Sequence, residues 1–197
     1  ILKGVFMIAV IDSGGANITS VLSAFERLDV KTVFTKSAAE IRSADKVILP
    51  GVGAAKDAMN KLQESGLVDV ILNLQQPVMG ICLGMQLLFG SSEEGDVNTL
   101  GVFKEKVTRF VSTPEMPVPH MGWNNVSAKS DHPLLHNLGN DPYFYFVHSY
   151  YAPIVPETVG SCGYGTEFTA VVAKDNFMGC QFHPERSGVA GQRVLQN

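Results

Sequence analysis

The segment Pro77-Val78-Met79-Gly80-Ile81-Cys82-Leu83-Gly84, which continues as Met85-Gln86-Leu87-Leu88-Phe89, decides the fold. Its apolar first part predicts a buried strand, and its last part predicts a helix that begins directly after Cys82. Residues 80–84 fit the pattern glycine, any residue, nucleophile, any residue, glycine, in which a strand turns sharply into a helix. The two glycines relieve crowding around the turned residue. The segment therefore predicts an α/β fold with the Cys82 thiol exposed above a sheet.

A thiol in that turn lies at a helix N-terminus, whose partial positive charge stabilises a thiolate. We therefore interpret Cys82 as a nucleophile. The alternative is a buried cysteine that packs as a small hydrophobic residue, which is the usual state of free cysteines. Cys162 and Cys180 lie in apolar strands without such a turn, and for them we expect this second state.

Apolar runs and helical patterns alternate along the first half of the chain, which is typical of a parallel sheet with helices on both faces. The second half consists of strand patterns joined by turns. We expect a three-layer, flavodoxin-like, mostly parallel sheet with antiparallel additions in the C-terminal half, folded as one domain over residues 1–197. The expected strands are 6–11, 30–34, 46–49, 77–81, 102–111, 143–152, 158–164, 169–174 and 177–182, and the expected helices are 17–28, 54–65, 67–73 and 83–89.

The composition of the 197 residues excludes several classes of protein. A hydrophobic share of 45% and a net charge of −4 exclude disorder. With 15 Lys and Arg against 19 Asp and Glu, there is no basic excess for a nucleic-acid partner. Apolar runs are too short for a transmembrane helix, so we expect no membrane partner. Three cysteines without a CxxC pair suggest a reducing compartment, and without a convincing targeting segment we expect a cytoplasmic protein.

A thiol nucleophile needs a base, and His183 directly follows an apolar strand. Ligands and catalytic groups of open α/β sheets gather at the carboxyl ends of the strands. Glu185 lies two residues beyond, across Pro184, where its carboxylate could orient the imidazole as the third member of a Cys-His-Glu triad. The alternative is a capping or surface histidine. His120 and His148 also lie beside strand ends, and His132 and His136 fall in a polar loop where we expect them to be solvated.

Other kinds of site fit the sequence less well. No histidines and cysteines have the spacing of zinc ligands, so we expect no metal and no other cofactor. The glycine-rich turn at 50–53 lacks the Gly-Lys-Ser/Thr of a phosphate loop, and residues 12–17 are a poor dinucleotide fingerprint. That turn can instead point backbone N–H groups at a tetrahedral intermediate, together with the N–H of Leu83.

Six segments, in this order, carry a family resemblance: PGVG (50–53), GICLGMQLLF (80–89), SSEEG (91–95), PHMGWN (119–124), YFVHSYYA (145–152) and GCQFHPERSG (179–188). Together they resemble the class I, or triad, glutamine amidotransferases. Among these, the last three segments resemble the glutaminase subunit of imidazole glycerol phosphate synthase, an enzyme of histidine biosynthesis. The resemblance extends from Asp12 to Gly191.

The resemblance implies a reaction and a set of roles. Cys82 would attack the side-chain amide of glutamine, His183 would act as base and then as acid, and Glu185 would orient His183. Ammonia leaves, and water hydrolyses the glutamyl thioester to glutamate. The residues implied in glutamine binding are Gly51, Gln86, Glu94, His148, Ser149 and Tyr150, and those implied in the oxyanion hole are Val52, Gly53 and Leu83.

The resemblance also implies a partner, a cyclase subunit with a (β/α)8 barrel, in a heterodimer. Ammonia would pass into it by a sealed route, because free ammonia is mostly protonated at neutral pH. The products would be imidazole glycerol phosphate and aminoimidazole carboxamide ribotide. Asn17, Trp123 and Arg186 match positions that face the partner, although from composition alone a lone Trp is as often packed in a core. We expect little glutaminase activity until the loaded cyclase docks and sets the oxyanion strand.

The chain departs from the family at both ends. Residues 1–6 precede Met7, where the family chain begins, and we interpret them as non-native or extra residues. The chain also ends before the family's final apolar turn. Three rival functions stay open: a glutaminase for anthranilate, guanylate or pyridoxal phosphate synthesis, a silent flavodoxin-like binding module, and a cysteine hydrolase or peptidase on the same fold.

Overall fold

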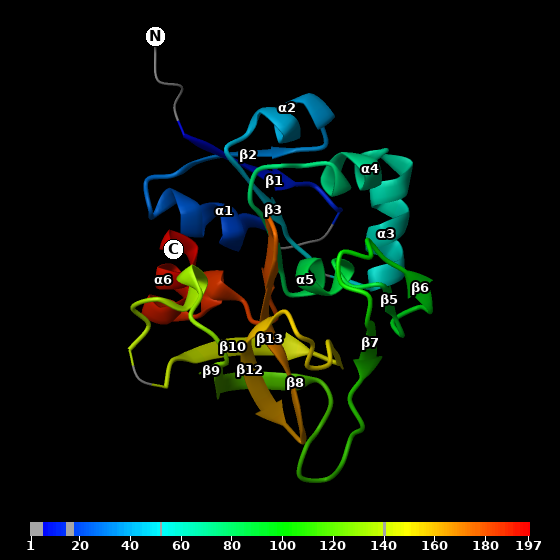
Figure 1. Cartoon of the computed structure of the whole chain (residues 1–197), viewed down its shortest axis with the longest axis vertical. Coiled ribbons are helices and arrows are strands. Elements are labelled where there is room, and N and C mark those ends of the chain that lie inside the picture. The colour runs from blue at the N-terminus through cyan, green and yellow to red at the C-terminus, as the bar shows by residue number, and fades with distance from the viewer. Residues whose placement is uncertain (1–5, 15–17, 52, 140) are drawn as a thin grey trace.

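An eight-stranded sheet forms the centre of the computed structural model, which describes residues 6–14, 18–51, 53–139 and 141–197 (Figure 1). Its strands lie in the order β2-β1-β3-β4-β14-β13-β12-β9. Their bounds are β1 Met7–Ile11, β2 Lys31–Thr35, β3 Lys46–Leu49, β4 Val78–Ile81, β9 Ser127–Ala128, β12 Thr158–Tyr164, β13 Thr166–Lys174 and β14 Phe177–Cys180.

The sheet has a parallel half and an antiparallel half. β2, β1, β3, β4 and β14 pair in parallel, and β14, β13, β12 and β9 pair antiparallel. The change of direction at β14 confirms the expected mostly parallel sheet with antiparallel additions. It also makes β14 the last parallel strand, directly beside β4.

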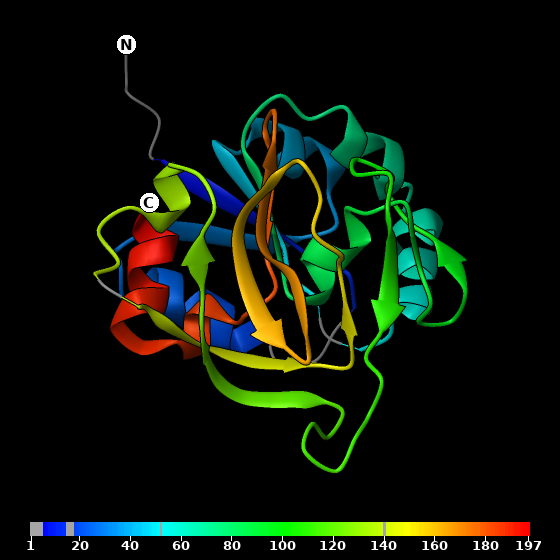
Figure 2. The same cartoon turned by 60° about the horizontal axis from the view of Figure 1, so that its bottom comes forward.

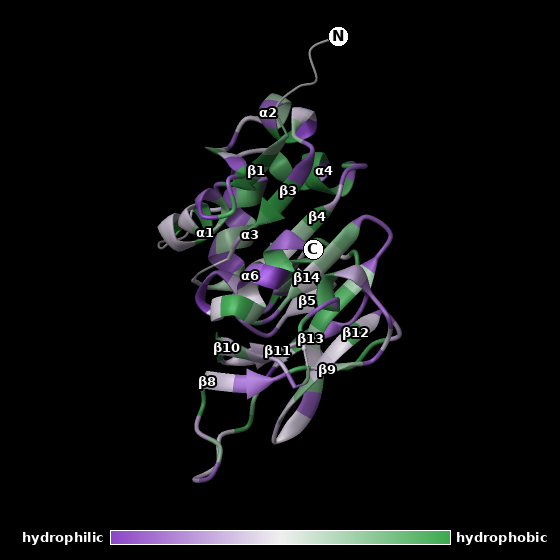
Figure 3. Cartoon of the chain, turned by 90° about the vertical axis from the view of Figure 1, so that its left-hand side faces the viewer, coloured by the Kyte–Doolittle hydropathy of each residue, from purple (hydrophilic) through white to green (hydrophobic). Residues whose placement is uncertain are grey.

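Helices cover both faces of the sheet. α1 and α6 lie together on one side, and α3 and α4 lie on the other (Figure 1). Alternate residues of β1 explain this: Ala9 and Ile11 pack into the core under α2 to α5, whereas Ile8 and Val10 pack into the core with α1 and α6. The helices are α1 Ile18–Glu26, α2 Ala38–Ser43, α3 Ala55–Glu64, α4 Leu67–Leu72, α5 Leu83–Leu87 and α6 Gly188–Gln196, with short 3-10 turns at Pro133–Leu135 and Pro184–Arg186. The buried strands β3, β4 and β14 are mainly hydrophobic (Figure 3).

Two smaller sheets complete the fold: a ribbon at the end of the molecule that Figure 2 brings forward, and a four-stranded sheet at the side, next to α3 and α5. β8 (His120–Asn125) and β10 (Tyr143–His148) form an antiparallel ribbon. The other sheet has the order β11-β7-β5-β6, from Tyr150–Tyr151, Lys106–Arg109, Ser91–Ser92 and Val97–Asn98. The ribbon packs its Phe144 and Phe146 side chains into the core beneath it, next to β14.

The structure differs from the expected elements at several points. The expected strand 143–152 breaks at Ser149, because β10 pairs with β8 whereas β11 pairs with β7. Of the expected strand 102–111, only 106–109 is β7, since Phe103 instead packs its ring against Phe89. α2, α6 and β8 were not expected. α6 contains Gly191, and glycine obscures a helical pattern because it disfavours helices by about 1 kcal/mol.

Two glycines allow the strand β4 to turn into α5. A Cβ atom on Gly80 would lie 2.6 Å from the backbone nitrogen of Met85, and one on Gly84 would overlap the backbone carbonyl of Leu49 on β3. The helix thus begins in direct backbone contact with the neighbouring strand. This close approach supports the interpretation of residues 80–84 as a sharp strand-to-helix turn.

Replacement of Gly84 by Ala should test this contact. Because the obstructing atoms belong to the backbone, we expect the free energy of unfolding to fall by about 2 kcal/mol or more. Gly163→Ala is the matched control, since a Cβ atom there meets nothing within 4 Å and should change stability by less than about 1 kcal/mol. Urea unfolding of both variants measures the difference, and equal stability would contradict the packing argument.

Candidate active site

Two neighbouring parallel strands end at the candidate site. Cys82 follows β4 and His183 lies three residues after the end of β14. The Cys82 N–H donates to the carbonyl of Cys180 at 2.8 Å, which continues the β4–β14 pairing one residue past the end of β4. The structure therefore brings together two side chains that are a hundred residues apart in the sequence.

Cys82 has a backbone conformation that residues other than glycine rarely adopt, with φ 53° and ψ −112°. It directly precedes the first turn of α5, and its side chain is nearly buried, with 8% of the residue exposed. Its Sγ lies 3.9 Å from the carbonyl oxygen of Val147 and 3.7 Å from Nε2 of Gln181. A strained residue of this kind is typical of a functional position.

His183 lies between Cys82 and Glu185. Its Nδ1 is 2.8 Å from Oε1 of Glu185, and both side chains are buried. Burial disfavours the charged imidazolium, but attraction to and hydrogen bonding with Cys82 and Glu185 outweigh burial and raise the pKa of His183 to about 10. The three groups therefore form one coupled unit that favours the protonated form of His183.

A buried amide pair lies beside this unit. Gln86 Nε2 donates to the Tyr150 carbonyl and to Oε1 of Gln181, both at 2.8 Å. Gln181 is fully buried and donates in turn to the Cys82 sulfur. Gln181 is not among the site residues predicted from the sequence, although its position directly after an apolar strand and two residues before His183 is a signal that could have identified it.

His120 and His148 form a second buried pair, with 3.0 Å between His120 Nδ1 and His148 Nε2. His148 Nδ1 must donate to the Tyr150 carbonyl, 2.7 Å away, so its Nε2 accepts from His120 Nδ1. His120 Nε2 then accepts from the Asn124 amide at 3.4 Å. Burial lowers the pKa of His120 to about 4 and that of His148 to about 3, so both rings are neutral.

Several residues predicted to bind glutamine or an oxyanion have other contacts in the structure. Gly51 packs directly against Leu83 and Gly84 at the turn, so the glycine-rich turn lies beside Cys82. Glu94 caps α3, since its Oε2 accepts from the Ala55 N–H at 2.8 Å. Burial raises the pKa of Glu94, and the charge of Asp57 adds a smaller increase. The hydrogen bond from Ala55 acts in the opposite direction but does not outweigh burial.

The remaining residues predicted for substrate, oxyanion or partner binding have the following positions. The carbonyl of Ser149 accepts from the Phe110 N–H, and Gly53 is exposed with φ 99°. Trp123 is 56% exposed on β8, and the exposed Arg186 places its guanidinium 5.5 Å from the centre of the Tyr145 ring. Asn17 and Val52 lie outside the described residues.

Cys162 and Cys180 are buried thiols, as expected. Burial raises the pKa of Cys162 to about 12, and burial raises that of Cys180 well above its ordinary value. His136 pairs with Asp131 on the surface, as expected for a solvated loop, whereas His132 is partly buried and accepts from the Leu134 N–H.

Within the described ranges, no three histidine, cysteine or acidic side chains are grouped as metal ligands. None of the helices described has the length and apolarity needed to cross a membrane.

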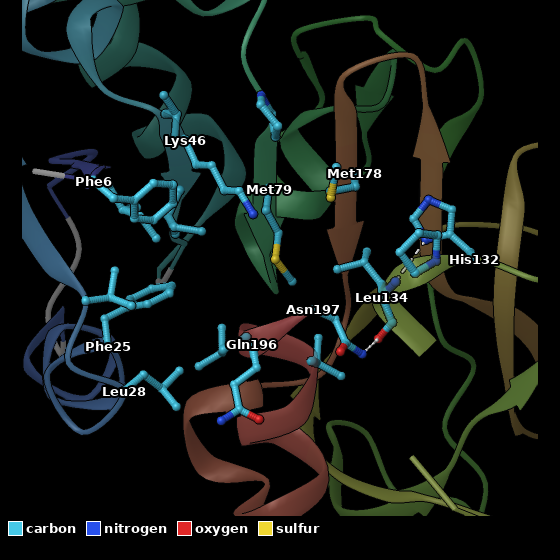
Figure 4. Close-up of a pocket in the computed structure, with 18 residues that line it drawn as sticks. Phe6, Phe25, Leu28, Lys46, Met79, His132, Leu134, Met178, Gln196 and Asn197 are labelled. Carbon is cyan, nitrogen blue, oxygen red and sulfur yellow. Dashed lines mark hydrogen bonds between the residues drawn. The ribbon is translucent and has the colours of Figure 1, made fainter. Parts of the chain in front are cut away.

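A separate apolar cavity of about 520 Å³ lies at the other end of the parallel strands (Figure 4). Lys46 at the start of β3 and Pro77 just before β4 line it, together with Met79, Met178 and Leu134. It is thus near the amino ends of these strands, whereas Cys82 lies beyond their carboxyl ends. None of the predicted site residues that the structure describes lines this cavity.

Comparison with known proteins decides the family. The family described as glutamine amidotransferase class-I matches residues 9–197. The chain belongs to the class-I glutamine amidotransferases. The match covers the whole sheet except the first residues of β1, together with every site residue described above.

Two relatives indicate the group of class-I glutamine amidotransferases to which the chain belongs. It is 50% identical over 190 residues to the imidazole glycerol phosphate synthase subunit HisH of Pasteurella multocida strain Pm70, with 96% of each chain covered. It is 49% identical over 190 residues to the HisH subunit of Haemophilus influenzae strain Rd, with 96% of this chain and 95% of the relative covered. The amidotransferase therefore belongs to the HisH group. A crystal structure of a glutamine amidotransferase has the same fold, with a TM-score of 0.74 at 16% identity over 96% of this chain and 95% of the other.

The raised pKa of His183 predicts a pH dependence of stability. A group whose pKa is higher in the folded amidotransferase stabilises it fully below the unfolded value of about 6.5, and this stabilisation is lost as pH rises toward 10. The difference in free energy of unfolding between the unmodified chain and His183→Gln should therefore shrink from pH 6.5 to pH 10. Urea unfolding at several pH values measures it, with His136→Gln as the surface control. A constant difference would contradict the coupling.

The paired rings predict definite tautomers. At pH 6, ¹⁵N spectra should show His120 and His148 neutral, each with its proton on Nδ1. Because burial lowers both pKa values, the unfolded chain binds protons that these rings do not, and stability should fall as pH drops from 6.5 toward 4. An imidazolium signal from either ring at pH 6 would show that the pair is arranged differently.

Proposed function

We propose that the chain hydrolyses glutamine to glutamate and ammonia through the triad of Cys82, His183 and Glu185, and delivers the ammonia to a cyclase subunit of imidazole glycerol phosphate synthase in histidine biosynthesis. The observation that carries the proposal is the grouping of a strained thiol, a protonated imidazole and a buried carboxylate beyond the ends of two adjacent strands. The HisH name of relatives that are about half identical supports the substrate and the pathway.

The first half of the reaction forms a thioester. The Cys82 thiolate attacks the carbon of the glutamine side-chain amide, and the carbonyl electrons move to oxygen. When the tetrahedral intermediate collapses, the C–N bond breaks and the His183 imidazolium gives its proton to the leaving nitrogen, so that ammonia leaves. Glu185 holds Nδ1 of His183, so Nε2 is the atom that exchanges protons.

The second half regenerates the thiolate. Neutral His183 takes a proton from a water molecule, and the hydroxide attacks the thioester carbon. The C–S bond breaks and His183 is again protonated beside the Cys82 thiolate. The product leaves as the side-chain carboxylic acid, which loses its remaining proton to solvent and becomes glutamate. The Glu185 carboxylate stabilises the imidazolium in both halves of the reaction.

The glycine-rich turn supports an oxyanion hole. Gly51 lies against the first residues of α5, so the N–H groups of Val52 or Gly53 and that of Leu83 are proposed to receive the developing negative charge. Glutamine is proposed to bind along Gly51, Gln86, Glu94 and the segment His148–Tyr150. Here the carbonyl of Tyr150 already serves as the acceptor that fixes Gln86.

The outer face of the β8–β10 ribbon is proposed to bind the cyclase. Met121 and Trp123 are 62% and 56% exposed there, and Arg186 lies over Tyr145 on the same face. The backbone of β10 contacts the triad directly, because its Tyr145 carbonyl accepts from the His183 N–H and its Val147 carbonyl lies beside Cys82 Sγ. A partner on this face would therefore lie close to the place where ammonia is released.

Triad variants test the hydrolysis. Glutamate release should be measured with purified chain alone and with cyclase plus its nucleotide ligand. We expect activity to rise strongly in the complex. Cys82→Ala should lower it by about 10³-fold or more, and Glu185→Gln by about 10²-fold or more, because the imidazole loses its orienting anion. Glu167→Gln, which removes a surface ion pair with Lys129, is the matched acidic control and should change little.

The same assay separates the rival functions. Equal release of glutamate with and without the cyclase would contradict the proposal that the chain has little glutaminase activity until the loaded cyclase docks. Turnover of peptide amides instead of glutamine would indicate a cysteine peptidase. No turnover in the complex, with an intact fold, would indicate a silent binding module.

A further inference from the structure

We propose, building on the hydrolysis proposed above, that Gln181 is a further catalytic residue, whose side-chain N–H donates to the Cys82 sulfur and stabilises it as the thiolate. The two atoms, Gln181 Nε2 and Cys82 Sγ, lie 3.7 Å apart. Gln181 is fully buried, so no water competes for this contact. It directly follows Cys180, whose carbonyl holds the Cys82 backbone N–H, so the sheet pairing itself places this amide beside the sulfur.

The orientation of the Gln181 amide is fixed by its second hydrogen bond. Gln86 Nε2 carries two N–H groups, which donate to the Tyr150 carbonyl and to Oε1 of Gln181. Because Oε1 of Gln181 must accept there, its Nε2 faces the sulfur. The reverse orientation would place two N–H groups against each other at Gln86 and an oxygen against the thiolate.

The Tyr150 carbonyl fixes the other end of this chain of hydrogen bonds. It accepts from Gln86 and also from Nδ1 of the neutral His148. His148 is in turn hydrogen-bonded to His120. The Tyr150 carbonyl and the side-chain amides of Gln86 and Gln181 therefore all have defined hydrogen-bond partners within the protein. The donor at the sulfur is thus preorganised before glutamine arrives.

The charge state of the sulfur determines what this donor contributes. A neutral thiol can donate to the Val147 carbonyl, 3.9 Å away, but a thiolate only accepts hydrogen bonds. The Gln181 N–H therefore favours the charged form, in addition to the His183 imidazolium. Cys180 shows the contrast, because it is buried beside Glu185, donates to the Phe182 carbonyl and stays a thiol.

Alkylation of Cys82 tests the proposal without substrate or partner. The full chain is treated with iodoacetamide between pH 5.5 and 9.5, and modification of Cys82 is followed by mass spectrometry. Gln181→Met keeps an unbranched side chain of similar length but has no N–H. We expect alkylation at pH 7 to slow by about tenfold, because the thiolate loses a hydrogen bond to its charged sulfur. The rate should recover at pH 9.5, so that the whole pH profile moves to higher pH.

Gln181→Glu provides a second variant if the first does not fold. As a carboxylate it can still accept from Gln86, but it has no N–H for the sulfur and adds a negative charge, so alkylation at pH 7 should slow further. Thr169→Val, on the adjacent strand β13, is the control, because it removes buried hydrogen bonds to Thr158 and Pro153 without touching Cys82. Its profile should match that of the unmodified chain.

Three outcomes would overturn the proposal. They are an unchanged pH profile in Gln181→Met, an unchanged profile in Gln181→Glu, or an equal displacement in Thr169→Val, which would indicate general loosening. Failure of the proposed function is a separate result, since it would appear as an unmodified chain that releases no glutamate with cyclase present. In that case the alkylation profile still decides whether Gln181 stabilises the thiolate.

Discussion

The backbone contact between the start of α5 and the end of β3 is the constraint on which the rest of the site depends. Gly84 has no room for a side chain against the Leu49 carbonyl, and Gly80 has none against α5. With the helix held so close, the residue between strand and helix must adopt positive φ, and that residue is Cys82. The strain at the nucleophile is therefore a consequence of close packing between two elements of the core, and hydrophobic burial on both sides maintains it.

The neighbouring elements contribute different groups around this fixed sulfur. The segment after β14 contributes the Gln181 amide and the His183 imidazole, and the 3-10 turn that follows contributes the Glu185 carboxylate. The strand β10 contributes backbone carbonyls, including that of Val147. Histidines serve two different purposes here. The pKa of His183 is raised because its interactions with Cys82 and Glu185 outweigh burial, whereas the pKa of His148 is lowered because burial outweighs its one carbonyl partner. The partners of a buried histidine therefore decide whether its protonated form is favoured or disfavoured.

The sequence predicts the parallel half of the fold well, because most of its strands are short apolar runs that end in a glycine, proline or polar residue. The grouping of Cys82, His183 and Glu185 is also predictable, since the carboxyl ends of parallel strands meet at one edge. The β8–β10 ribbon is not predictable from the sequence. The segment from His120 to Asn125 is mostly polar or glycine, and it gains its strand conformation only by pairing with Tyr143–His148. Gln181 was missed for a similar reason: its partners, Gln86 and Tyr150, come from distant segments.

The β8–β10 ribbon has two faces with separate duties. Alternate residues point inward, where Phe144, Phe146 and His148 support the site, and outward, where Met121, Trp123 and Tyr143 meet solvent. Because side chains alternate strictly along a strand, substitutions at the outward positions leave the inward ones in place. Under the proposed function, a new partner could therefore be acquired at alternate positions of two strands, while the reacting groups beneath them stay in place.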